Sequence, residues 1–290
     1  MSFTQNLKEQ ISAIKNTCDI CDIAELSAIV RLCTSYRDGD ICILTENENV
    51  AMRIKLLFEK VYFKQIDFIN RNGTFRYHPD IDFFVDEIAQ RLNLFSTAED
   101  SFTSQECCNS AFIRGAFLGG GSMIDPKIRY HMEFDAKHEG YANQICAALK
   151  KLGITARITC RKSRYIAYIK DYSSIADTLG IMGAVGAAMN LYNISIEKEI
   201  RNTANRQANC EIANIEKTTK TAFVQIEAIK KLKKHMIYSE LPESLREIAE
   251  LRCDYPEESL KELGEHLNPP IGKSGVNHRL KRIMDIADKL

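Results

Sequence analysis

The chain contains one helical segment twice, and this internal repeat restricts the possible folds more than any other feature. CDIAELSAIVRLCTS begins at Cys21, and CNSAFIRGAFLGGGS begins at Cys108. When the two cysteines are aligned, small and apolar residues match along both segments, with Ala28 opposite Gly115. Their apolar periodicity predicts a helix in each copy. A duplicated helix of this kind predicts two similar units related by a pseudo-twofold axis.

The segments that follow the two helices also share one order. Each copy continues with an expected strand, an amphipathic helix, a strand hairpin and a closing helix, with room for one more strand beside the opening helix. Asn72-Gly73 and the polar run RKSR (161–164) mark the two hairpin turns. The sequence therefore predicts an α+β fold with tandem repeats over about residues 20–95 and 107–182. The expected elements are 39–47, 48–62, 64–79 and 81–95 in the first copy, and 128–136, 138–153, 156–171 and 172–182 in the second.

Glycines in the second opening helix predict that it packs closely against the first. Gly115, Gly119 and Gly120 recur at helical spacing, and small residues let two helix backbones approach each other. Gly121 stands where the helix is expected to end, and a glycine there favours a left-handed C-terminal cap. We therefore expect the two opening helices to lie side by side along the pseudo-twofold axis.

The segments ELSAIVRLCTS and FIRGAFLGGGS resemble degenerate forms of the LAGLIDADG helix of homing endonucleases. The resemblance implies a tandem αββαββα domain in which paired helices join two four-stranded sheets into a saddle over the DNA major groove. In that family an acidic residue before the last glycine of each motif binds the catalytic metal, and here these positions fall on Cys33 and Gly120. Neither is a carboxylate, whereas a magnesium site needs anionic oxygen ligands. We therefore expect a retained scaffold with no catalytic residue, no metal and no cofactor.

The last third of the chain predicts a small all-α domain. IEKTTKTAFVQIEAIKKLKKHM (215–236) has an apolar helical face, and LPESLREIAELRCDYP (241–256) and SLKELGEHL (259–267) predict two shorter helices. The segment NPPIG cannot continue a helix, and Ser274 is the expected N-cap of the last helix. This order of helices and turn predicts a helix-turn-helix.

The C-terminal segments RNTANRQANCEIANIEKT (201–218) and SLKELGEHLNPPIGKSGVNHRLKRI (259–283) resemble the WhiA family of bacterial regulators. The resemblance covers nearly the whole chain and implies a degenerate LAGLIDADG domain joined to a helix-turn-helix domain. We place these domains at 1–200 and 221–290, with a linker at 201–220. The resemblance further implies a transcription regulator of cell division, chromosome segregation or sporulation. Its partners would be double-stranded promoter DNA and, in addition, another transcription factor or RNA polymerase.

The start of the last helix supplies the expected contacts with DNA bases. The N-terminal residues of a recognition helix meet base edges, and Asn and Arg pair bidentately with adenine and guanine. Residues 271–284 carry four Lys or Arg and no Asp or Glu, although a small helical bundle with a solvated cationic face would show the same pattern. The expected base contacts are Ser274, Gly275, Asn277, His278 and Arg279, and the expected phosphate contacts are Lys273, Lys281 and Arg282.

A second basic stretch coincides with the second hairpin. Residues 150–170 contain seven Lys or Arg and no acidic residue, although the whole chain has a formal net charge of +0. A hairpin of this charge either faces nucleic acid and releases counterions, or forms a charged sheet edge that prevents aggregation. On the first interpretation, the DNA-binding residues are Arg161, Lys162 and Arg164.

The ten cysteines are expected to be reduced thiols that pack as small apolar residues. Cys18 and Cys21 form one CxxC, and Cys107 and Cys108 are adjacent, but no second CxxC exists to complete a typical zinc motif.

The N-terminal residues lack the apolar core of a signal peptide, and no apolar run is long enough to span a membrane. We therefore expect no metal, no membrane partner and a cytoplasmic, nucleoid-associated protein.

Two other classes of function remain open at this point. A metal-dependent endonuclease could use displaced acids, of which Asp38, Asp40 and Asp125 lie downstream of the two opening helices. A protein-interaction scaffold tethered to DNA is the other alternative, since helix packing serves all three functions. The leading expectation is a sequence-specific DNA-binding regulator that is not an enzyme.

Overall fold

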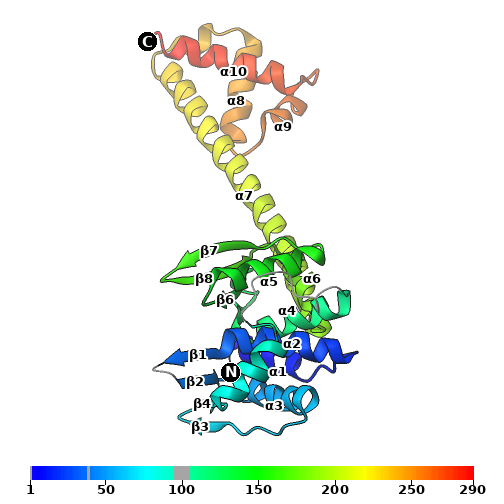
Figure 1. Ribbon diagram of the computed structural model, residues 1–290. Coiled ribbons are helices and arrows are strands. Elements are labelled where there is room, and N and C mark those ends of the chain that lie inside the picture. The colour runs from blue at the N-terminus through cyan, green and yellow to red at the C-terminus, as the bar shows by residue number, and fades with distance from the viewer. Residues whose placement is uncertain (1, 38–39, 95–104) are drawn as a thin grey trace. The chain divides into compact units, whose positions relative to one another are not determined.

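A computed structural model describes residues 2–37, 40–94 and 105–290. The chain divides into two compact units, Met1–Lys198 and Glu199–Leu290. The first unit contains two four-stranded sheets with helices packed against them, and the second is helical (Figure 1). None of the helices in the described ranges is long and apolar enough to cross a membrane.

The first repeat is an antiparallel four-stranded sheet that packs against helices. Its strand order is β1-β2-β4-β3. In the amphipathic helix α3, Asn47 accepts a hydrogen bond from the Val50 amide and caps the N-terminus. The elements are α1 (Phe3–Ser12), α2 (Asp19–Cys33), β1 (Thr34–Arg37), β2 (Asp40–Thr45), α3 (Glu48–Tyr62), β3 (Ile69–Arg71), β4 (Thr74–Tyr77) and a π-helix, η1 (Phe83–Ala89). The end of the helix expected at 81–95 falls partly outside the described residues.

The second repeat has the same topology, with strand order β5-β6-β8-β7. Its elements are α4 (Glu106–Gly120), β5 (Gly121–Met123), β6 (Met132–Ala136), α5 (Glu139–Lys151), β7 (Arg157–Arg161), β8 (Arg164–Ile169) and α6 (Tyr172–Ile181). The predicted α+β fold with two tandem repeats is therefore confirmed. The extra strand expected beside each opening helix is β1 in the first repeat and β5 in the second.

The two hairpin turns lie where the sequence places them. Asn72 and Gly73 connect β3 to β4 with φ of 51° and 79°. Lys162 and Ser163 connect β7 to β8 with φ of 49° and 63°. Positive φ at both central residues is the requirement of the type I′ turn, whose twist matches that of the flanking strands.

The paired helices α2 and α4 lie side by side through the core of the first unit (Figure 1). A Cβ atom added at Gly115 would stand 2.2 Å from the Glu25 carbonyl oxygen, and one at Gly119 would stand 3.1 Å from that of Ile29. The predicted close approach of the two backbones is therefore present. Both contacts run from N- to C-terminus along both helices, so the helices are parallel and their N-termini lie at the same end.

Gly121 does not form the left-handed cap that we expected. Its φ and ψ are −78° and 145°, and the chain passes directly from α4 into β5. A Cβ atom at Gly121 would lie 2.4 Å from Cδ2 of Phe117. The glycine is needed because the turn folds back against a buried aromatic ring, which the sequence does not reveal.

A buried ionic network crosses the α2–α4 interface. Glu25 is fully buried and accepts two hydrogen bonds from Arg53, at 2.7 and 2.8 Å. The Arg114 guanidinium lies 3.3 Å from the same carboxylate and also donates to the Met182 carbonyl at 3.1 Å. Asn16 donates a further hydrogen bond to Glu25 at 2.8 Å. Three buried charges thus satisfy one another at the point where both repeats meet.

The second unit contains most of one long helix and four short ones. The elements are α7 (Val185–Lys234), which begins in the first unit, η3 (Ile237–Glu240), α8 (Glu243–Asp254), α9 (Leu260–Glu265) and α10 (Lys273–Ala287). Residues 201–220, which we expected to be a linker, lie within α7 and are helical. They contain neither proline nor glycine, and their Asn residues have ordinary helix propensity, so nothing in the segment ends the helix.

A buried arginine and a glycine N-cap define two turns of the second unit. Arg252 is 1% exposed and donates to the backbone carbonyls of Tyr255, Pro256 and Glu258, which fixes the turn between α8 and α9. The N-cap of α10 is Gly272, so the prediction that Ser274 caps this helix was wrong. The Gly272 carbonyl already accepts from the amides of Gly275 and Val276, and Ser274 is therefore inside the first turn.

Candidate nucleic-acid interface

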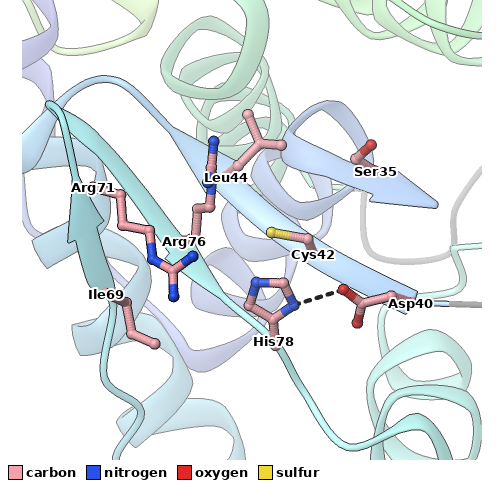
Figure 2. A pocket seen from close by; sticks show the side chains of 8 residues that line it. All are labelled: Ser35, Asp40, Cys42, Leu44, Ile69, Arg71, Arg76 and His78. Carbon is pink, nitrogen blue, oxygen red and sulfur yellow. Dashed lines mark ion pairs between the residues drawn. The ribbon is translucent and has the colours of Figure 1, made fainter. Parts of the chain in front are cut away.

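One face of the first sheet is covered by helices, and the other face is open and basic. Ile41 and Ile43 of β2 are buried against the helices, whereas Cys42 and Leu44 alternate onto the open face. A hollow of about 590 Å³ lies on this face. Figure 2 shows the side chains that line it. Arg71 of β3 and Arg76 of β4 extend over it, and His78 points toward Asp40, with 2.9 Å between Nδ1 and Oδ2. The lining residues are Ser35, Asp40, Cys42, Leu44, Ile69, Arg71, Arg76 and His78.

The open face of the second sheet has a similar character. Strand register places Glu133, Tyr168 and Arg157 in one row across the sheet and Asp135, Ile166 and Thr159 in the next. A smaller hollow of about 170 Å³ lies on this face. Cations from β7 and from the end of β8 surround it, while Glu133 is paired with His131 at 3.0 Å. The lining residues are His131, Glu133, Thr159, Arg161, Ile166, Tyr168 and Lys170.

The three hairpin residues singled out by the sequence are close together at the β7–β8 end of this face. Arg161 and Arg164 are directly opposite each other in the register, and Lys162 occupies the turn between them. Arg161 and Lys162 are exposed, whereas Arg164 is half-buried and bound to Asp135 at 2.6 Å. Two of the three cations are thus free to approach a phosphate, and the charge of the third is largely balanced by a carboxylate.

The helix-turn-helix prediction places α10 as the recognition helix, and its exposed face carries the expected residues. Val276, Leu280 and Ile283 are buried against α8 and α9. The opposite face exposes polar and cationic side chains along its length. The exposed residues are Lys273, Ser274, Asn277, His278, Lys281 and Arg282.

Gly275 and Arg279 differ from the other candidates on α10. Both are half-buried. A Cβ atom at Gly275 would lie 3.2 Å from Cδ1 of Ile271, so the glycine fits against the preceding turn. Arg279 donates to the Ser244 carbonyl of α8 at 3.4 Å. A long side chain of this kind can leave a weak surface hydrogen bond, but its resting contact is within the helix-turn-helix.

Cys33 and Gly120 occupy the two positions that carry acids in LAGLIDADG enzymes. Cys33 is buried, and burial raises the pKa of its thiol to about 11, which keeps it protonated at neutral pH. A Cβ atom at Gly120 would stand 2.6 Å from the Asp135 carbonyl oxygen, so no acidic side chain fits there. Among the displaced acids, Asp40 is paired with His78, and Asp125 accepts the amide of Lys127 at 2.9 Å. Asp38 lies outside the described residues.

Comparison with known proteins identifies the family. Family models match the WhiA LAGLIDADG-like domain over residues 109–201 and the WhiA C-terminal HTH domain over residues 204–287. A curated protein of Alkaliphilus metalliredigens, "Probable cell division protein WhiA", is 35% identical and aligns over 100% of this chain and 98% of its own. This chain belongs to the WhiA family. The resemblance noted in the sequence is thereby confirmed.

Other WhiA proteins agree in length and fold. A "Probable cell division protein WhiA" of Clostridium novyi is 37% identical over 100% of this chain and 98% of its own. The crystal structure of full-length DUF199/WhiA from Thermatoga maritima matches with a TM-score of 0.62 and 25% identity, covering 100% of this chain and 99% of that one. The N-terminal LAGLIDADG domain of DUF199/WhiA matches with a TM-score of 0.51 and 20% identity, over 63% and 92% of the two chains, and shows the shared fold.

Several basic residues on the open sheet faces were not among the predicted site residues of this WhiA chain. They are Arg71 and Arg76 on the first sheet, and Arg157 and Lys170 on the second. Residues two or four positions apart along a strand share a face, so the polar alternation of Arg157, Thr159 and Arg161 in β7 is a signal that could have identified Arg157. In the first hairpin the strands are short, and the face of Arg71 follows only from its register with Thr74.

Proposed function

We propose that this WhiA-family protein is a sequence-specific DNA-binding transcription regulator that acts in cell division, chromosome segregation or sporulation. This proposal rests on the exposed polar and cationic face of α10. This face contains Asn277 and His278 near the N-terminus of the third helix of a helix-turn-helix, where recognition helices meet base edges. The names of the curated relatives support a role in cell division.

Within this proposal the two units have different tasks. The α10 residues Ser274, Gly275, Asn277, His278 and Arg279 read bases, and the cations Lys273, Lys281 and Arg282 bind phosphates. Arg161, Lys162 and Arg164 of the hairpin bind the DNA backbone without reading sequence. Double-stranded promoter DNA is the principal partner, and another transcription factor or RNA polymerase is a further one. The protein is cytoplasmic and associated with the nucleoid.

We further propose that the protein lacks nuclease activity, because Cys33 stays protonated and Gly120 has no space for a carboxylate. Supercoiled and linear DNA incubated with the protein and Mg²⁺ or Mn²⁺ is expected to stay intact over hours. Cleavage that increases with protein concentration, and that persists through chromatographic fractions, would restore the endonuclease interpretation.

Neutralising the hairpin is expected to weaken DNA binding in a salt-dependent way. Arg161→Gln with Lys162→Gln removes two exposed cations, and each phosphate contact contributes about one unit to the slope of log K against log salt. We expect the slope to become smaller by about two units, with the preference for one sequence over another unchanged. Fluorescence anisotropy of the full chain on labelled duplex DNA, over a series of salt concentrations, measures both quantities.

The matched control removes the same charge from the helical side of the first unit. Lys55→Gln with Lys150→Gln changes two exposed cations on α3 and α5, which pack on the covered faces of the sheets. We expect this variant to keep the slope of the unmodified chain. Equal slopes for the hairpin variant and this control would show that the hairpin does not touch phosphate.

A further inference from the structure

Four cysteines meet at one end of the paired helices of the first unit. Cys18 is the N-cap of α2 and Cys21 lies in its first turn, while Cys107 and Cys108 lie in the first turn of α4. Because the two helices are parallel, their N-termini come together. The four Sγ atoms all lie within 4.8 Å of one another.

Four of the six distances between the sulfur atoms lie near the edge length of one tetrahedral site. Cys18 and Cys21 are 3.3 Å apart, Cys21 and Cys108 are 3.7 Å apart, and Cys108 lies 3.9 Å from both Cys18 and Cys107. A tetrahedral zinc ion with bonds of about 2.3 Å to sulfur separates its ligands by about 3.8 Å. A disulfide bond is much shorter, at about 2.05 Å, and all four are free thiols. This spacing suits a single ion and leaves no space for a cluster of several metals.

The surroundings of the four thiols favour their ionised form when a cation is present. Both helices direct their N-terminal amides and the positive end of their dipoles toward the sulfur atoms, and this field stabilises thiolates. Cys107 is exposed and Cys18 is half-buried, which gives an ion a path from solvent.

We propose that Cys18, Cys21, Cys107 and Cys108 bind one Zn²⁺ ion as a tetrathiolate site. Each thiol gives up its proton to solvent as its sulfur bonds to the metal, and no electron is transferred. Four soft sulfur ligands in tetrahedral arrangement select zinc over magnesium or calcium. Two ligands come from each repeat, so the ion cross-links the repeats at the start of the pseudo-twofold helix pair.

The sequence indicated no metal because it contains only one CxxC. A second pair with the usual spacing is unnecessary here, since the side-by-side helices bring the adjacent pair Cys107-Cys108 against the CxxC of the first repeat. The aligned cysteines of the internal repeat, Cys21 and Cys108, are the two buried ligands. The site is therefore a product of the duplication.

The test uses the full chain, purified under reducing conditions and loaded with zinc or cobalt. We expect one zinc ion per chain by mass spectrometry of metals, and the visible absorption of tetrahedral tetrathiolate cobalt after substitution. The variant Cys18→Ser with Cys107→Ser is expected to lose stoichiometric zinc and this absorption. The control Cys160→Ser with Cys210→Ser alters two exposed cysteines outside the cluster, and is expected to keep both.

Alkylation of the unmodified chain decides the question even if the serine variant fails to fold. Cys107 is exposed, so it reacts readily in the metal-free protein, and a bound ion would protect it. We expect zinc to suppress alkylation of Cys107 at least about tenfold, and a chelator to restore it. The proposal is overturned if Cys107 reacts at the same rate with and without zinc, or if the serine variant and the control bind equal amounts of zinc.

Discussion

Gly115→Ala is expected to destabilise the first unit by about 3 kcal/mol or more, because the added methyl group overlaps the backbone of the neighbouring helix. The added Cβ would stand 2.2 Å from the Glu25 carbonyl oxygen, which belongs to the backbone of α2 and cannot move without shifting the whole helix. Hydrogen exchange of amides in α2 and α4 measures the loss, because these amides report on the first unit alone.

Gly186→Ala is the matched control for Gly115→Ala. Gly186 is in the first turns of α7, and a Cβ atom added there meets no other atom within 4 Å. Alanine has a higher helix propensity than glycine, so the control is expected to leave stability unchanged or raise it by up to about 1 kcal/mol. If both variants were equally stable, the close contact between α2 and α4 would not exist in solution.

Glu25→Gln is expected to cost about 3–5 kcal/mol of stability, because it leaves two buried guanidinium groups without their anionic partner. Arg53 loses a bidentate ion pair with bonds of 2.7 and 2.8 Å, and Arg114 loses its charged contact at 3.3 Å. The glutamine side chain has the same shape, so the loss reports on charge and not on packing. The same amide exchange in α2 and α4 measures the effect.

Asp67→Asn provides the corresponding control on the surface. Asp67 pairs with Lys55 at 2.7 Å, but its side chain is 94% exposed. Water screens such a pair, so we expect its loss to fall within the error of the measurement. A Glu25→Gln chain as stable as the Asp67→Asn chain would mean that the buried network does not hold the two repeats together.

The repeat architecture could be predicted because it depends on local patterns. The type I′ turns at Asn72-Gly73 and Lys162-Ser163 follow from residues that tolerate positive φ, and from the polar break between two strands. The helix pair follows from small residues at helical spacing, such as Gly115 and Gly119. Each of these signals lies within one short segment of sequence.

The features that the sequence did not reveal depend on contacts between distant segments. The extended conformation of Gly121 depends on the ring of Phe117. Gly120 has no space for a carboxylate side chain because the backbone of β6 lies against it. The cysteine cluster requires the N-termini of α2 and α4 to meet. Residues 201–220, which were expected to be a linker, lie within α7, because a segment without proline or glycine contains nothing that ends a helix.

Which residues bind DNA stays a prediction, although the structure sorts the candidates. Asn277, His278, Lys281 and Arg282 are exposed on α10, while Arg279 is in contact with α8. Exposure on one helical face identifies the side chains that can reach a groove.

Specific and non-specific DNA binding by the recognition helix can be compared in one experiment. A duplex would first be selected from random DNA by the unmodified full chain, and a shuffled version of the same composition would be prepared. Anisotropy titrations at fixed salt would then compare the unmodified chain with Asn277→Ala and His278→Ala combined. We predict that the variant loses about tenfold or more in affinity for the selected duplex and binds the shuffled duplex as before, because base contacts contribute about 1–3 kcal/mol each. If the variant keeps the full preference for the selected duplex, α10 is not the element that reads the sequence.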